Sequence, residues 1–375
     1  MDRIIVSIYV HPEFYPPTLN AIINLASIYD EVVVLTRNNI ETNFPFPVNV
    51  KIKALGKRIS VIESEQSSYF RKILFFIEFS IAHIPYLANK KNRFICYDAI
   101  PLLTISILSR LLTLNRYVWY HNHDMPNIKD CRKFSISWFA ARFEKWGMKN
   151  ISRFSLPSID RLIYYPELDR SRVEFLFLPN YPSSVIFKQY IQKIAPLEIK
   201  VLYQGSIATM RGFEEFATFM RKSEIPMYLT LKGPVRNNYD NDLKQLFSNL
   251  NVTERVDFVG ISEYMNLVED MQNYHIGLAV QLGQDEIRKT LGTASNKIYE
   301  YAASGLPVIV TDNEQFRKYL EGEDWVFFYN VATNNFQAII SCIIRNYEEL
   351  SLRARLAFET KYNFEKYFFS DEKLQ

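Results

Sequence analysis

Residues 295–311, SNKIYEYAASGLPVIVT, are the most informative part of the sequence. Ser295 is a residue type that caps helices, Gly305 is suited to a left-handed helix end, and Pro307 cannot continue a helix. The pattern predicts a helix over 296–304, a tight turn and then a buried Val-Ile-Val strand. A helix that feeds directly into an apolar strand is typical of a parallel α/β sheet.

The polar residues of this stretch indicate a ligand site at the start of the helix. Unpaired amides at a helix N-terminus bind anions such as a diphosphate. Asn296 and Lys297 lie in the first turn, and Glu300 follows in the second, where a carboxylate can accept both hydroxyls of a ribose. A purely structural helix needs no such combination, so we expect a nucleotide site here.

Residues 201–216, VLYQGSIATMRGFEEF, carry a second candidate site. We expect a strand that ends at Gly205, a short loop that contains Ser206, and a helix that begins near Arg211. The planar guanidinium of arginine offers charge and two donors to a phosphate. Because the helix dipole disfavours a cation at a helix start, an anion is expected to compensate Arg211.

Strand-like and helix-like segments alternate through the first half of the chain. The predicted strands are 3–10, 31–36, 94–98, 116–121 and 174–178. The predicted helices are 18–29, 66–88, 100–114 and 132–150. The proline-rich stretch LPNYPSS then interrupts the pattern, and we place a domain boundary after residue 180.

The alternation restarts in the second half, which predicts a second α/β domain over 181–350. Its predicted strands are 199–203, 227–232, 255–259, 275–280 and 307–311. Its predicted helices are 212–221, 239–249, 262–272, 296–304, 314–320 and 333–348. The helical tail 351–375 is expected to pack back on the first domain, 1–180. The fold class is therefore α/β with two Rossmann-like domains, and a ligand is expected where the carboxyl ends of both sheets face a cleft.

Composition supports a compact enzyme. The chain has 375 residues, of which 48% are hydrophobic, enough for two cores, and it shows no repeat. Cys96, Cys131 and Cys342 lie far apart, which argues against a disulfide framework or a zinc site and favours a reducing compartment. The first residues lack a signal-peptide core, and the longest apolar runs fall short of the ~20 residues that span a bilayer. We therefore expect a cytoplasmic protein.

Charge is divided unequally between the halves, with a net +7 over residues 1–180 and −4 over 181–375. Residues 51–133 hold 14 basic and 6 acidic residues beside aromatic runs such as LFFIEF. This pattern fits peripheral contact with an anionic membrane, at the inner face for a cytoplasmic chain, or a solvated face beside an ordinary core helix. No motif for nucleic-acid binding accompanies the charge.

These segments resemble the donor-binding domain of GT-B fold glycosyltransferases similar to glycosyltransferase family 4. The resemblance rests on YQGSIATMRG, VDFVG, HIGLAV and above all NKIYEYAASGLPVI. In the first half, VWYHNHD is similar to the family's strand that ends in a His-acid pair. LPNYP resembles its interdomain linker, and KYNFEKYF resembles its C-terminal crossover helix.

The resemblance implies sugar transfer from a nucleotide diphosphate donor, UDP- or GDP-linked, with retention of configuration and without a metal or other cofactor. Glu300 would hold the ribose, Asn296 and Lys297 would lie by the diphosphate, and Arg211 would neutralise the leaving phosphate. His123 would lie near the transferred sugar, although His121 is an alternative and His11 is a candidate for the acceptor side. Breaking a glycosyl phosphate bond leaves negative charge, which preorganised cations stabilise.

The chain also departs from the family pattern. Gly292 stands where the family has a first glutamate, Ser206 where many members have Arg, and Arg211 where they have Lys. Lys232 could supply a second cation. Asp240-Asn241-Asp242 has the spacing of a metal pair, but we assign it to the start of a surface helix.

Three functions remain open at this point. The leading hypothesis is a hexosyltransferase-type glycosyltransferase that acts on a glycan or lipid-linked acceptor in surface polysaccharide or glycoconjugate synthesis. A nucleotide-sugar epimerase would keep the fold and change the reaction. A non-catalytic partner subunit that binds sugar nucleotides is the third possibility.

Overall fold

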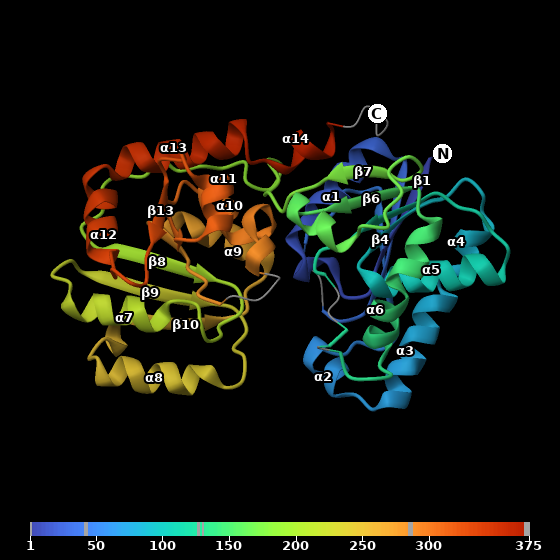
Figure 1. Ribbon diagram of the computed structural model, residues 1–375, viewed down its shortest axis with the longest axis horizontal. Helices are drawn as coiled ribbons and strands as arrows, with labels where there is room; N and C mark the ends of the chain where they lie inside the picture. Colours follow the sequence, from blue (N-terminus) through green and yellow to red (C-terminus); the bar gives the residue numbers. More distant parts are fainter. Residues whose placement is uncertain (1, 41–43, 126–127, 130, 284–287, 371–375) are drawn as a thin grey trace. The chain divides into compact units, whose positions relative to one another are not determined.

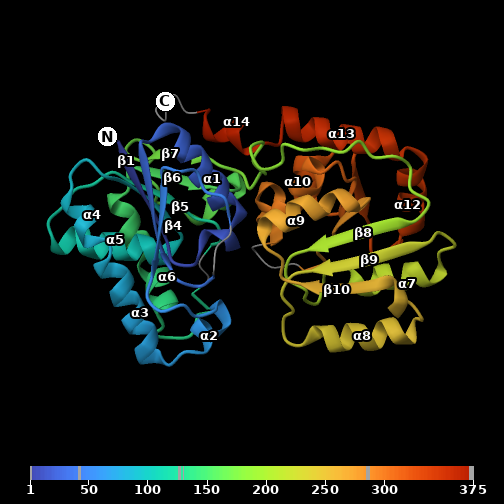
Figure 2. The same ribbon diagram turned by 180° about the vertical axis from the view of Figure 1, so that it is seen from behind.

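The structure is a computed structural model, shown from two sides in Figures 1 and 2. It describes residues 2–40, 44–125, 128–129, 131–283 and 288–370. The chain divides into two compact units. Unit 1 holds the residues up to Pro179 together with those from Tyr367 onward, and unit 2 is Asn180–Lys366.

Unit 1 is built on a seven-stranded sheet in the order β3-β2-β1-β4-β5-β6-β7. All of its neighbouring strands pair in parallel, as the βαβ alternation predicted. The strands are β1 (Arg3–Ile8), β2 (Glu31–Arg37), β3 (Val50–Leu55), β4 (Arg93–Tyr97), β5 (Val118–His121), β6 (Arg153–Leu156) and β7 (Glu174–Phe177).

Helices cover both faces of this sheet, with α1 on one face and α5 on the other (Figures 1 and 2). The helices are α1 (Pro16–Ile28), α2 (Val61–Gln66), α3 (Tyr69–Ile81), α4 (Ile84–Ala88), α5 (Ala99–Leu111) and α6 (Ile136–Gly147). The main core combines strand residues such as Ile5 and Phe94 with Leu102 and Ile105 of α5. Because both faces are covered, β2 is buried along its whole length.

Unit 2 repeats the plan with six parallel strands in the order β10-β9-β8-β11-β12-β13. The strands are β8 (Ile199–Gln204), β9 (Met227–Lys232), β10 (Val256–Gly260), β11 (Ile276–Ala279), β12 (Val308–Thr311) and β13 (Val326–Tyr329). The reversal of strand order between β8 and β11 is the point at which doubly wound sheets bind ligands.

The helices of unit 2 also form two layers, with α7 and α8 on one face of the sheet and α9 and α10 on the other (Figures 1 and 2). They are α7 (Phe213–Lys222), α8 (Tyr239–Asn249), α9 (Tyr264–Asp270), α10 (Asn296–Ala303), α11 (Glu314–Leu320), α12 (Phe336–Arg345) and α13 (Tyr347–Thr360). The α7 face of the core contains Phe213, Phe216 and Met220 packed against Leu229 and Leu278.

The predicted single helix over 66–88 is divided in the structure into two helices, α3 and α4, and α2 ends where the prediction begins. Ser68 accepts from the Arg71 amide as the N-cap of α3, and Pro85 lies in the first turn of α4. The N-cap serine and the proline therefore divide the apolar run into separate helices. The sequence analysis also missed β3, β6 and β13, which are short or, like β3, carry exposed lysines on one face.

The C-terminal tail consists of two helices, α13 and α14 (Phe364–Phe368), and only its end joins unit 1. In unit 2, the Phe364 amide donates to the Pro182 carbonyl at 3.0 Å. In unit 1, the Phe368 ring stacks on Trp119 with centroids 5.9 Å apart. Residues 371–375 of the predicted crossover segment lie outside the described part of the chain.

Candidate functional site

The carboxyl ends of β8 and β9 approach each other closely at two glycines. A Cβ atom at Gly233 would lie 2.1 Å from the Gly205 carbonyl oxygen, so no larger residue fits. Gly205 has a φ of 123° and Gly233 a φ of 138°, values that glycine adopts without strain. The Gly205 amide donates to the Lys232 carbonyl at 2.8 Å. The turn after β8 is therefore fixed against β9.

Arg211 follows in this turn, and its side chain is anchored beyond the end of β11. Its Nη1 donates to Gln281 Oε1 at 2.5 Å. Gln281 is fixed in turn, because its amide donates to the Thr311 hydroxyl at 2.7 Å and its carbonyl accepts from that hydroxyl at 2.9 Å. The buried Arg211 Nε has no hydrogen-bond partner in the described part of the chain. A fixed cation with a free buried donor favours an anionic ligand.

Lys297, in the first turn of α10, places a second cation beside the same turn. Its Nζ lies 4.1 Å from the centroid of the Tyr203 ring, and a Cβ atom at Gly205 would lie 3.1 Å from that nitrogen. Burial and the charge of Arg211 lower the pKa of Lys297 well below its usual value, while the Glu300 carboxylate opposes the shift. The positive charge of Arg211 therefore disfavours the charged form of Lys297 unless an anion binds beside them.

The start of α10 adds to this positive field. Ser295 occupies the N-cap position, but its side chain makes no capping hydrogen bond, contrary to the expectation from the sequence. The Asn296 Oδ1 is buried and has no partner within the described ranges. The amides of the first turn lack a side-chain cap and lie at the positive end of the helix dipole. An anion such as a diphosphate would satisfy both the helix end and the two cations.

Glu300 lies one turn further along α10 and is 3% exposed. Its Oε1 accepts from the Tyr264 hydroxyl at 2.9 Å, and its Oε2 accepts from Gln204 Nε2. Burial raises the pKa of Glu300 to about 7, although these two hydrogen bonds and Lys297 lower it. Each carboxylate oxygen keeps a lone pair for a further donor, as a ribose diol would require.

Two other predicted residues have partners of their own. Lys232 is 4% exposed and forms an ion pair with Asp270, so its charge is already neutralised within unit 2. The Ser206 hydroxyl accepts from Arg236 Nε at 3.2 Å. Arg236 is thus a further cation beside the β8 turn, and the sequence analysis did not identify it because it follows β9 in a loop without a motif.

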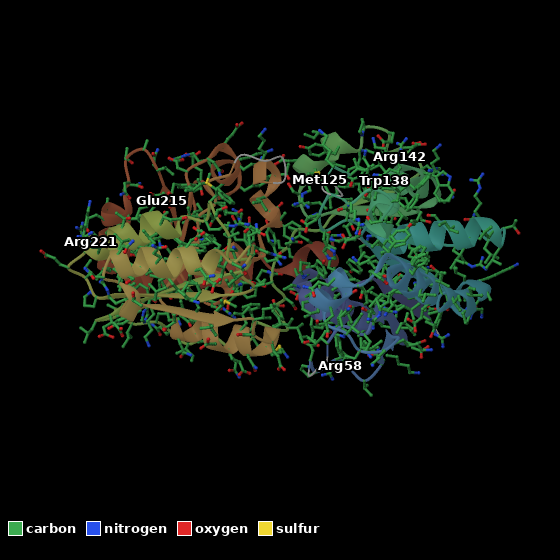
Figure 3. All side chains as sticks on the ribbon, turned by 90° about the horizontal axis from the view of Figure 1, so that it is seen from below. Arg58, Met125, Trp138, Arg142, Glu215 and Arg221 are labelled. Carbon is green, nitrogen blue, oxygen red and sulfur yellow. The ribbon has the colours of Figure 1, made fainter. Side chains whose placement is uncertain are left out.

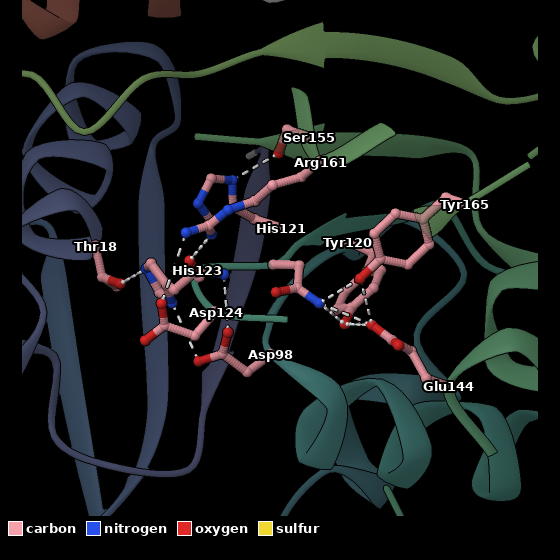
Figure 4. A network of polar contacts seen from close by, with 11 residues as sticks. Thr18, Asp98, Tyr120, His121, His123, Asp124, Glu144, Ser155, Arg161 and Tyr165 are labelled. Atoms are coloured by element: carbon pink, nitrogen blue, oxygen red, sulfur yellow. Dashed lines mark hydrogen bonds and ion pairs between the residues drawn. The ribbon is translucent and has the colours of Figure 1, made fainter. Parts of the chain in front are cut away.

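Unit 1 carries a separate cluster around His123, shown in Figure 4. His123 Nδ1 lies 3.1 Å from Asp98 Oδ2, and its Nε2 lies 2.9 Å from the Thr18 hydroxyl. Tyr15 and Tyr97 stack on the ring, each with centroids 5.0 Å apart. The imidazole is 4% exposed. The carboxylate fixes the proton on Nδ1, and Nε2 then accepts from the hydroxyl.

Asp98 was not among the predicted site residues, yet it is the acid that contacts both the ring and the backbone amide of His123. Its side chain is 33% exposed, and its Oδ1 accepts from the His123 amide at 2.9 Å. Its backbone has φ 68° and ψ 175°, a region that almost only glycine occupies. The position of Asp98 directly after β4, at the carboxyl edge of a parallel sheet, was the available sequence signal.

The other two candidate histidines are buried and neutral. Burial lowers the pKa of His11 to about 4. Burial and the charges of His123 and Arg161 lower the pKa of His121 well below its usual value. His121 Nδ1 lies 2.8 Å from the Ser155 hydroxyl, so this ring is held inside the sheet. Neither of these two histidines is exposed to a ligand.

The neighbouring Asn122 is fixed by an acid inside unit 1 (Figure 4). Glu144 Oε1 accepts from Asn122 Nδ2 at 2.7 Å, from the Tyr120 hydroxyl at 2.5 Å and from the Tyr165 hydroxyl at 3.1 Å. Burial raises the pKa of Glu144. This hydrogen-bonded network holds Asn122 in place between the two histidines. All of its side chains are buried, so we assign it a structural role.

Helix α3 has an exposed outer face that no other described residue buries. Nine of its thirteen residues are apolar, yet Phe79 is its only buried side chain. Phe70, Leu74, Ile77 and Ile81 are exposed and lie on one stripe of the helix; we call them the α3 patch. The basic residue Arg71 directly follows Phe70 in the chain. Figure 3 shows the side chains of the described residues, with Arg58 and Arg142 of unit 1 labelled.

Four further observations bear on the sequence predictions. In the described part of the chain, Cys96, Cys131 and Cys342 form no disulfide. Asp240 and Asp242 lie in the first turn of α8, where Asp240 pairs with Lys244 at 2.8 Å, as expected for a surface helix. Among the described residues, no group of three or more His, Cys, Asp or Glu is placed to hold a metal ion. No helix in the described ranges has the length and apolarity to cross a bilayer.

The chain is similar in structure to several glycosyltransferases. Sucrose-phosphate synthase from Thermosynechococcus elongatus is 15% identical with a TM-score of 0.68, over 97% of this chain and 96% of that one. HepE from Anabaena, solved with UDP and glucose, is 13% identical with a TM-score of 0.66 and the same coverage. WaaG, a glycosyltransferase of lipopolysaccharide biosynthesis, is 13% identical with a TM-score of 0.67, over 96% of each chain.

No protein-family model matches the sequence, and no curated protein matches it in sequence. At identities this low, the structural likeness establishes the fold. The chain has the α/β fold of the GT-B glycosyltransferases, with the two parallel sheets that the sequence predicted.

The raised pKa of Glu300 predicts a pH-dependent stability. Its folded pKa of about 7 exceeds the ordinary glutamate pKa of 4.5, so the folded state keeps a proton that the unfolded state loses. This group therefore costs stability as pH rises from 4.5 to 7, by about 3 kcal/mol in all. In urea unfolding, Glu300→Gln should gain stability relative to the wild type across this pH range.

The matched control is Glu254→Gln, which removes an exposed glutamate of unit 2. Its stability difference from the wild type should stay constant over the same range. A Glu300→Gln difference that does not change with pH would show that Glu300 is already ionised at pH 4.5.

Proposed function

We propose that the protein is a retaining glycosyltransferase that moves a sugar, of the hexosyl type, from a nucleotide diphosphate donor to an acceptor, without a metal. The observation that carries this proposal is the pair of like charges in unit 2, Arg211 and Lys297, held beside an uncapped helix start. Keeping two cations together costs free energy unless an anion neutralises them. The comparison protein HepE was solved with UDP and glucose, which supports a UDP-linked donor. A GDP-linked donor is the alternative.

The proposed chemistry follows from where charge develops. When the bond between the sugar and the diphosphate breaks, an electron pair stays on the phosphate oxygen. Arg211, Lys297 and the amides at the start of α10 stabilise that charge because they are already in place. Asn296 is proposed to contact the same diphosphate region, and Glu300 to accept the ribose hydroxyls.

In unit 1, we assign the substrate-facing role to Asp98 and a positioning role to His123. The Asp98 carboxylate contacts His123 and is 33% exposed, whereas His123 is covered on both ring faces. The imidazole and its backbone amide together hold the Asp98 carboxylate in one orientation. The exposed part of the Asp98 carboxylate would then accept hydrogen bonds from hydroxyls of the acceptor or of the transferred sugar.

We also propose that the α3 patch rests on an anionic membrane, which would bring the enzyme to a membrane-bound acceptor. Apolar side chains enter the headgroup boundary, and flanking cations attract anionic lipids. The net charge of +8 over residues 51–133 supports this reading. The place of the enzyme in surface polysaccharide or glycoconjugate synthesis, and its cytoplasmic location, stay predictions.

Arg211→Ala should reduce turnover by roughly 30- to 1,000-fold, which corresponds to ~2–4 kcal/mol of transition-state stabilisation. The assay measures nucleoside diphosphate release from a panel of UDP-, GDP- and ADP-linked sugars. Arg221→Ala is the matched control, because Arg221 is exposed in the last turn of α7 (Figure 3). Its turnover should equal that of the wild type.

Equal turnover of Arg211→Ala and the wild type would remove Arg211 from the mechanism. Binding of a sugar nucleotide without any release of nucleotide would instead favour the non-catalytic partner subunit. Conversion of the donor sugar into its epimer would favour the epimerase.

The membrane contact has its own test. Phe70→Ser/Leu74→Ser should lower partitioning onto vesicles of 30% phosphatidylglycerol in phosphatidylcholine by tenfold or more, because each buried apolar side chain contributes about 1.5–3 kcal/mol. Leu352→Ser/Leu356→Ser, an exposed pair with the same spacing on α13, is the control. Partitioning should also weaken as salt rises. Equal partitioning of both variants would contradict the assignment.

A further inference from the structure

Unit 1 contains a groove of about 420 Å³ at the carboxyl ends of β1 and β2. It begins at residues that directly follow these strands, and α2, α3 and the start of α6 form its walls. Its described lining includes Tyr9, Val10, Asn39, Tyr69, Lys72, Phe75, Ile100, Arg132 and Ile136. Because ligands of parallel sheets bind at the carboxyl ends of the strands, the groove lies at a functional edge of this unit.

The walls of the groove are mostly apolar. Val61, Ile100 and Ile136 are aliphatic, and Tyr9 and Phe75 add aromatic rings. A groove of this chemistry buries an apolar chain by the hydrophobic effect. A ligand made only of sugar would leave this apolar surface without a match.

Its charged lining is of one sign. Lys72 and Arg132 are the charged residues of the described lining, and no acidic residue belongs to it. The groove therefore favours a ligand with an anionic group, and a phosphate fits both the ammonium and the guanidinium.

Asn39 supplies a third requirement. It is 9% exposed, and its Oδ1 has no hydrogen-bond partner within the described ranges. Its Nδ2 makes only a long contact, 3.5 Å, to the Ile59 carbonyl. A buried acceptor without a donor is costly, and a ligand hydroxyl would satisfy it. The sugar hydroxyls of an acceptor offer such donors.

We propose that this groove is the acceptor site and that the acceptor is a lipid with a phosphate-linked sugar. The inference rests on the proposed glycosyl transfer and names its acceptor class. The apolar walls take the chain, Lys72 and Arg132 take the phosphate, and Asn39 accepts from a sugar hydroxyl. Helix α3 contributes Tyr69, Lys72 and Phe75 to the groove while its opposite face carries the α3 patch, so one helix contacts both the membrane and the lipid.

The test uses farnesyl phosphate below its micelle concentration as the probe, titrated by calorimetry in the presence of saturating UDP. The wild type should bind it, whereas farnesol and inorganic phosphate should each bind at least tenfold more weakly. Ser64→Phe fills the groove from α2, and Ser137→Trp fills it from α6. Each should weaken binding at least tenfold while leaving UDP binding unchanged.

Charge recognition is tested with adjacent residues of α3. Lys72→Gln should weaken binding of farnesyl phosphate several-fold, whereas Arg71→Gln should not, because Arg71 does not line the groove. Equal binding by all variants, or displacement of the probe by UDP, would overturn the inference. Intact UDP binding with no binding of farnesyl phosphate would overturn the acceptor assignment alone, whereas loss of UDP binding would contradict the proposed function itself.

Discussion

The placement of two basic side chains, Arg211 and Lys297, around the turn after β8 is the constraint on which the candidate donor site depends. The fold holds Arg211 through Gln281 and Thr311, and it holds Lys297 on α10 against the Tyr203 ring. The close approach of Gly205 and Gly233, with the hydrogen bond from the Gly205 amide to the Lys232 carbonyl, keeps the turn after β8 in place. The packing of unit 2 therefore maintains a cationic site. An anionic ligand would lower the electrostatic free energy of that site. A preorganised site of this kind pays its reorganisation cost during folding and not during the reaction.

Glu300 balances this field from the next turn of α10. Its buried carboxyl group is held by Tyr264 and Gln204, and its pKa near 7 leaves both protonation states accessible. In unit 1 the corresponding polar group is the Asp98–His123 pair. The backbone at Asp98 is strained, with a positive φ of 68°. Strain of this kind persists where the surrounding structure determines it, and it is common at functional sites.

Much of this could be predicted from the sequence, because local signals agree with the fold. The turn at Gly305 and the strand after Pro307 were confirmed, and so were the alternating parallel units. Gln281 and Tyr264 could not be found, since their roles depend on contacts between distant segments. Asp98 was missed although it directly follows β4 at the carboxyl edge of the sheet. The neutralisation of Lys232 by Asp270 was equally invisible, because 38 positions separate the two residues along the chain.

The most direct test of the central claim is calorimetric titration of UDP, GDP and ADP into the wild type, Lys297→Met and Lys222→Met. Lys222 is an exposed lysine at the end of α7 and serves as the matched control. The account predicts that one nucleoside diphosphate binds, that its affinity falls as salt rises, and that Lys297→Met loses at least tenfold while Lys222→Met loses nothing. Absence of binding by all three nucleotides, or equal binding by both variants, would contradict it.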